Sequence, residues 1–158
     1  MLFRSSIQPY AAQVFGGLFK NPTTSVRTIA AKRTFWEKAT ILHQEAHRDS
    51  SKPLPRRYSR HYYDLYRLSC TPIRGTSVEN IQLLHEVVEF KKRFYPSAWA
   101  NYDAAKPGTL RLLPIERNEA ALKADYQSMK AMLFGAIPTY EEIVAGLAKL
   151  ESEINSRA

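Results

Sequence analysis

The chain has 158 residues, the length of one domain, and 44% of them are hydrophobic, which supplies a packed core and excludes a wholly disordered protein. Its 23 Lys and Arg outnumber 15 Asp and Glu, and its single cysteine excludes an internal disulfide. No run approaches the roughly 18 apolar residues of a membrane span. These features are typical of a basic, soluble, intracellular domain.

Most of the net positive charge lies near the N-terminus. Residues 1–33 contain five basic side chains and no acid, whereas residues 114–158 contain five basic and seven acidic side chains. Such a field attracts polyanions, for example nucleic acid or the phosphates of nucleotides. A solvated basic face with no ligand is the alternative interpretation.

Residues 1–33 are predicted to form a strand and a loop. The run Ser25–Ile29 is rich in β-branched residues, while Pro9, Gly16-Gly17 and Asn21-Pro22 interrupt any helix. An acid-free start also fits a mitochondrial transit peptide, but the helix breakers favour the strand. Because one short strand needs partners that the chain does not supply, the pattern indicates an incomplete sheet.

From Thr34 onward the hydrophobic spacing predicts five helices, which cover about residues 34–47, 58–69, 77–95, 116–134 and 139–154. Capping boxes are predicted at Thr34–Glu37 and Thr139–Glu142, and Ser77 is the predicted cap of the third helix. A turn is expected at Lys106–Thr109. The fold class is therefore mainly α, with a short β/loop segment followed by about five helices.

Two candidate chemical residues lie on the first two predicted helices. If these helices pack antiparallel, Lys38 and Asp64 differ in height by only about 4–5 Å at 1.5 Å per residue, so they can face one pocket. A lysine there would hold a triphosphate, and an aspartate would polarise a hydroxyl or orient a cation. The alternative is an ordinary i,i+4 ion pair between Arg60 and Asp64, with Lys38 solvated.

Other patterns are better explained by structure than by chemistry. His43 and His47 stand one helical turn apart, but a zinc site needs further ligands that are not evident, so a metal is rejected. The tyrosines between Tyr58 and Tyr66 could stack on bases but are assigned to the core. Lys91–Arg93 is interpreted as a solvated helix end.

At these residues the sequence resembles a known family. Arg33–Lys38 and Arg60–Leu65 are similar to motifs of the AbiEii-type nucleotidyltransferase toxins, which carry a Phe-Trp-Glu-Lys helix start and a basic residue shortly before an Asp-Leu pair. The segments Val88–Lys91, Lys106–Thr109 and Pro138–Glu141 resemble a subgroup of that family. The resemblance covers nearly the whole chain.

The resemblance implies a polymerase-β-like nucleotidyltransferase of a toxin–antitoxin system. It implies that Lys38 binds the nucleoside triphosphate, that Asp64 is a catalytic carboxylate, and that Arg60 helps to bind the nucleotide. It further implies Mg²⁺, an RNA acceptor such as the 3′ end of tRNA, a cognate antitoxin, and a location in the bacterial cytoplasm. A mitochondrial location is the alternative if residues 1–33 are a transit peptide.

Two departures from the family matter. His61 stands where many members have an acid, and no Asp-x-Asp pair, which would hold the divalent ions, occurs in the sequence. We therefore expect residues 1–33 to be a remnant strand and loop of the catalytic core, and residues 34–158 to be its helical C-terminal region. We also expect the 158-residue chain to be inactive when it is isolated. The alternative is a non-catalytic basic helical adaptor that binds RNA or protein.

Overall fold

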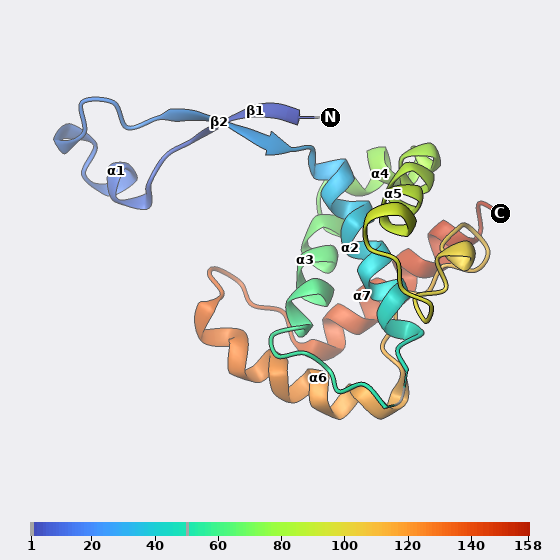
Figure 1. Ribbon diagram of the computed structural model, residues 1–158. Helices are drawn as coiled ribbons and strands as arrows, with labels where there is room; N and C mark the ends of the chain where they lie inside the picture. The colour runs from blue at the N-terminus through green and yellow to red at the C-terminus, as the bar shows by residue number, and fades with distance from the viewer. Residues whose placement is uncertain (1, 50) are drawn as a thin grey trace.

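The N-terminal residues form an arm that extends away from a body of helices (Figure 1). In this computed structural model, which describes residues 2–49 and 51–158, the arm consists of residues 2–30. Strand β1 (Leu2–Ile7) pairs antiparallel with strand β2 (Thr24–Ile29), and a short helix α1 (Tyr10–Val14) and a 3₁₀ turn η1 (Gly16–Leu18) close its tip. The predicted strand at 25–29 is confirmed, whereas β1 and α1 were not predicted.

The arm has almost no core of its own. Ile7, Val14, Phe15 and Leu18 are all at least half exposed, and among residues 4–30, whose burial the structure describes, only Ala12 is buried. The two strands form the whole sheet, so the outer edge of each is without a partner strand in the described chain. An isolated two-stranded hairpin is at best marginally stable in water.

The body contains the five predicted long helices and one additional short helix. Its elements are α2 (Ala31–Ala46), α3 (Ser59–Ser69), α4 (Ile73–Val78), α5 (Ile81–Phe94), η2 (Tyr102–Ala104), α6 (Glu116–Met129), η3 (Lys130–Met132) and α7 (Tyr140–Asn155). Helix α2 lies in the centre and contacts α3, α4 and α5, while α3 also contacts α6 and α7 (Figure 1). The mainly helical fold class is confirmed.

The core forms around one face of α2. Phe35, Trp36, Ala39 and Leu42 recur at helical spacing and are fully buried, and the rings of Phe35 and Trp36 meet edge to face with centroids 5.0 Å apart. Other helices complete the core with Tyr62, Leu65, Leu84, Val87, Leu122, Tyr126, Ile143, Leu147, Leu150 and Ile154. Tyr62 thus has the core position assigned to it from the sequence.

The starts of two helices differ from the prediction. Helix α2 begins at Ala31, directly after β2, so Thr34 lies inside it and forms no capping box. Ser77 lies within α4, and α5 is instead capped by the side chain of Asn80. Thr34 and Ser77 are each preceded by residues that are already helical, so neither stands at a helix start where its side chain could cap free backbone N–H groups. The capping box at Thr139 and the Lys106–Thr109 turn are confirmed.

Two close contacts lie in the body, one between α3 and α7 and one at the end of α2. At Gly146 in α7, an added Cβ would lie 2.5 Å from the ring of Tyr66 in α3, so only glycine allows this approach. The buried Glu45 carboxylate accepts two hydrogen bonds from Arg48, at 2.5 and 2.9 Å. None of the helices in the described ranges is long and apolar enough to span a membrane.

Candidate functional site

Lys38 and Asp64 meet between α2 and α3, which lie side by side and antiparallel (Figure 1). The Nζ atom of Lys38 donates to Oδ2 of Asp64 at 2.7 Å. Their predicted convergence is confirmed, and it follows from the antiparallel packing that places the two positions at similar heights. Asp64 therefore pairs with Lys38, and no ion pair with Arg60 forms among the residues described.

His61 completes this contact. Its Nδ1 atom lies 3.1 Å from Nζ of Lys38, so the neutral ring can accept a second hydrogen bond from the ammonium group. The pKa of His61 is lowered to about 4, mainly by burial and in part by the neighbouring charges of Lys38 and Arg60. The ring also packs edge to face against Tyr58. His61 is thus uncharged at neutral pH and stays compatible with the adjacent cation.

The contact opens into a hollow, here called the Lys38 pocket, of about 560 Å³. Its lining residues are Thr34, Lys38, Asp64, Arg67, Leu68, Cys70 and Thr71. Lys38 and Arg67 provide cationic N–H donors suited to phosphate oxygens, whereas the hydroxyls of Thr34 and Thr71 already donate to backbone carbonyls. Arg67 and Thr34 were missed in the sequence, although Arg67 stands one helical turn after Asp64. Arg60 is exposed and does not line the pocket.

The residues of the Lys38 pocket do not form a magnesium site. Magnesium prefers octahedral coordination by oxygen, and Asp64 is the one carboxylate lining the pocket. That carboxylate is already bonded to Lys38. Across residues 2–49 and 51–158, no three His, Cys, Asp or Glu side chains are grouped to hold a metal ion.

The paired histidines of α2 are bound to the protein itself. His43 is buried, its Nε2 donates to the carbonyl of Asn101, and its Nδ1 accepts from the backbone N–H of Arg111, each at 3.0 Å. His47 Nδ1 donates to the His43 carbonyl at 2.8 Å. Both ring nitrogens of His43 are therefore occupied by backbone groups.

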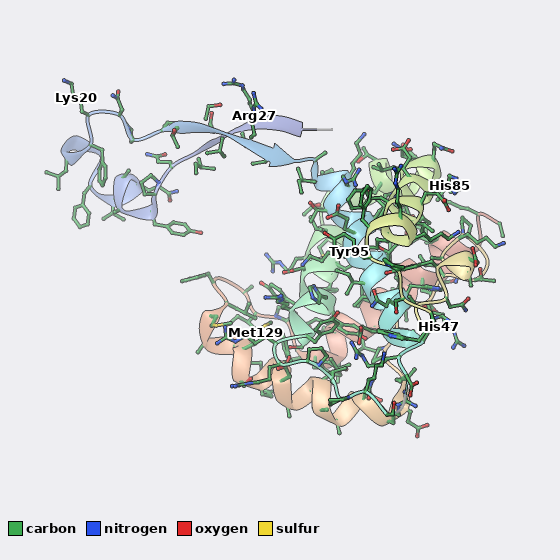
Figure 2. All side chains as sticks on the ribbon, viewed as in Figure 1. Lys20, Arg27, His47, His85, Tyr95 and Met129 are labelled. Carbon is green, nitrogen blue, oxygen red and sulfur yellow. The ribbon has the colours of Figure 1, made fainter. Side chains whose placement is uncertain are left out.

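A second hollow, here called the Lys91 pocket, lies along a different face of α2 and has a volume of about 680 Å³. Its lining residues are Ile29, Arg33, Glu37, Ile41, Gln44, Phe90, Lys91, Tyr95 and Tyr102. Figure 2 labels Tyr95 beside α2.

The interpretation of Lys91–Arg93 as a solvated helix end is wrong for Lys91, which is only 9% exposed. Its side chain turns toward α2, where its Nζ donates to the carbonyl of Glu37 at 3.2 Å. Lys92 points elsewhere and is paired with Glu89 and Asp103.

Comparisons with known proteins give one clear match. A family model described as "Nucleotidyl transferase AbiEii toxin, Type IV TA system" matches residues 2–146, which is most of the chain. No curated protein and no solved structure matches it.

Proposed function

Because the chain belongs to the AbiEii nucleotidyl transferase toxin family of type IV toxin–antitoxin systems, we propose that its Lys38 pocket binds the triphosphate of a nucleoside triphosphate during nucleotide transfer. The observation that carries this proposal is the 2.7 Å contact between Lys38 and Asp64 at a pocket that is also lined by the cationic side chain of Arg67. The family model matches residues 2–146, a range that includes both positions.

In this proposal Lys38 is the phosphate ligand. An ammonium group has three N–H donors, and Asp64 and His61 accept two of them, which leaves one for a phosphate oxygen. Because both acceptors are fixed on α3, the amine is held in place before the nucleotide arrives, and little side-chain entropy is lost on binding. Arg67 adds a second positive charge to the pocket. Arg60 is exposed, and its role in nucleotide binding remains a prediction.

Asp64 is the proposed catalytic carboxylate. Its Oδ2 atom is bonded to Lys38, and its side chain is 39% exposed, so an acceptor hydroxyl can reach it. A carboxylate at hydrogen-bond distance from a hydroxyl can take its proton as the oxygen attacks the α-phosphorus, while the bond from that phosphorus to the bridging oxygen breaks and pyrophosphate leaves. Lys38 would compensate the charge on the phosphate beside it.

The divalent ion that the family implies would be held elsewhere. The described residues do not form a magnesium site, and the sequence has no Asp-x-Asp pair. We therefore propose that residues 1–33 are a remnant strand and loop of the catalytic core, that residues 34–158 are its helical C-terminal region, and that this chain alone binds nucleotide but transfers none. An RNA, with the 3′ end of tRNA as the first candidate, is the proposed acceptor, and a cognate antitoxin is the proposed partner.

Binding of a fluorescent, non-hydrolysable nucleoside triphosphate to the 158-residue chain tests the pocket. Lys38→Gln should weaken binding about tenfold, because a charge-assisted hydrogen bond contributes about 1.5–3 kcal/mol. Lys123→Gln removes the same charge from an exposed lysine on α6 and should change binding less than about twofold. Equal binding by the two variants would contradict the proposal.

A transfer assay tests the role of Asp64. The chain is fused to a family segment that carries the Asp-x-Asp pair, and incorporation of labelled nucleotide into RNA is measured. Asp64→Asn should abolish labelling while nucleotide binding persists. The adaptor alternative predicts instead that Lys38→Gln modestly weakens RNA binding, that Asp64→Asn has no effect, and that no fusion labels RNA.

A further inference from the structure

The end of α5 carries exposed aromatic rings among basic side chains. Phe90, Phe94 and Tyr95 are 39%, 57% and 64% exposed. The Phe90 ring lies 4.7 Å from Phe94 and 6.1 Å from Tyr95, measured between centroids. The guanidinium of Arg33 lies 5.1 Å over Phe90, and that of Arg93 lies 5.3 Å over Phe94. We call these five residues the aromatic–basic platform.

Lys91 lies on α5 between Phe90 and Phe94, and it lines the Lys91 pocket together with Phe90 and Tyr95. Its ammonium group has three N–H donors, and the described structure gives it one acceptor, the Glu37 carbonyl. Burial lowers the pKa of Lys91 to about 8, against the opposing charge of Glu37. The Glu37 carboxylate is itself bonded to Arg33 at 3.0 Å. Lys91 is therefore a desolvated cation with donors to spare, which an anion would satisfy.

We propose that the aromatic–basic platform and the Lys91 pocket bind a short single-stranded segment of RNA. The bases stack on the exposed faces of Phe94 and Tyr95, and a backbone phosphate accepts hydrogen bonds from Lys91. Proteins that bind single strands combine stacking rings with cations in this way. A pocket of about 680 Å³ lies within the usual range for small ligands and has room for a nucleotide.

The charge around the Lys91 pocket favours a polyanion over a free aromatic acid, and the exposed rings beside it favour RNA over an acidic peptide. The arm ends at this pocket through Ile29, and residues 1–33 carry five basic side chains and no acid. A polyanion gains from such an extended field, whereas a single carboxylate gains only from Lys91. Arg33 and Glu37 of α2 line this pocket and the residues that directly follow them, Thr34 and Lys38, line the other, so a strand held here lies on the face of α2 next to that of Lys38.

This inference rests on the proposed function in one respect: it identifies the RNA as the acceptor strand. RNA binding at the aromatic–basic platform and nucleotide binding at Lys38 can nevertheless be measured separately. Loss of nucleotide binding in Lys38→Gln with unchanged RNA binding would support both proposals. Normal nucleotide binding in Lys38→Gln, together with weak RNA binding in Tyr95→Ala, would overturn the proposed function and support the platform.

Fluorescence anisotropy with a labelled oligoribonucleotide of about ten nucleotides tests the platform on the 158-residue chain. Tyr95→Ala should weaken binding about tenfold, because each stacked base contributes about 1–3 kcal/mol. Lys91→Gln should weaken it to a similar degree and reduce the slope of log affinity against log salt by about 0.7, the value for one phosphate contact on a single strand.

Two matched variants serve as controls. Lys92→Gln removes the same charge one position along, from a lysine outside the pocket, and Phe134→Ala removes an aromatic ring that is 80% exposed elsewhere on the surface. Both should bind RNA within about twofold of the unmodified chain. Because Lys91 is buried, Tyr95→Ala keeps the test valid if Lys91→Gln unfolds.

Three outcomes would overturn the inference. In the first, Tyr95→Ala binds RNA with the same affinity as the controls, and so does Lys91→Gln if that variant folds. The second is competition by adenosine monophosphate as strong as that by the unlabelled oligoribonucleotide, which would indicate a mononucleotide site. The third is displacement of the RNA by an acidic peptide of equal length at equal concentration, which would indicate a protein partner.

Discussion

Acidification should destabilise the body of helices through His43. The ring is buried, its Nε2–H donates to the Asn101 carbonyl, and its Nδ1 accepts from the backbone N–H of Arg111. Burial lowers the pKa of His43 to about 4, against the opposing effect of the Asn101 carbonyl, whereas an unfolded histidine has a pKa of about 6.5. Protonation at Nδ1 would remove the acceptor for Arg111.

The sign of the effect follows from these two pKa values. Since the folded pKa lies below the unfolded one, the unfolded chain binds the proton first as the pH falls. The contribution of neutral His43 is complete above pH 6.5, declines as the pH falls from about 6.5 to 4, and is absent below that range. Between pH 7.5 and 5.0 the free energy of unfolding should fall by about 2 kcal/mol on account of this residue.

Urea unfolding followed by circular dichroism at several pH values measures the effect. His43→Gln cannot be protonated, so it should be less stable at pH 7.5 yet lose about 2 kcal/mol less than the unmodified chain between pH 7.5 and 5.0. His61, whose pKa is also lowered to about 4, remains in both proteins and cancels in the difference. An identical pH dependence in the two proteins would refute the assigned burial and hydrogen bonding.

Two further predictions concern packing and buried charge. Gly146→Ala should lower the free energy of unfolding by about 1–3 kcal/mol, because the new Cβ meets the Tyr66 ring, and combining it with Tyr66→Ala should cost less than the sum of the two single changes. Glu45→Gln should cost about 2–3 kcal/mol, since it leaves the guanidinium of Arg48, whose side chain is 9% exposed, without its carboxylate partner. Glu37→Gln breaks a more exposed pair and should cost less than about 1 kcal/mol. If Glu45→Gln and Glu37→Gln lower the free energy of unfolding equally in urea or thermal unfolding, the prediction for Glu45 is contradicted.

The sequence predicted those features that depend on local patterns. The five long helices follow from apolar spacing, and the approach of Lys38 to Asp64 follows from helical rise once antiparallel packing is assumed. The cap at Thr139 is found where no helical residue precedes it, but the same pattern at Thr34 fails because Ala31 has already begun the helix.

The remaining features depend on contacts between distant segments. Lys91 stands in a run of three basic residues, and only the packing of α5 against α2 buries it. Cys70 and Thr71 line the Lys38 pocket because the segment after α3 folds beside it, which no spacing rule indicates, whereas the position of Arg67 one helical turn after Asp64 could have been recognised. Strand β1 has too weak a pattern to be recognised without its pairing partner β2.

The connection between the arm and the body has a mechanical consequence. A single residue, Ala30, separates the last residue of β2 from the first of α2, so hairpin and helix are joined without a flexible linker. Eight residues of helical rise, about 12 Å, separate that joint from Lys38. Any polypeptide that extends the hairpin by pairing with a free edge would therefore be tethered by one residue to the helix that carries the amine.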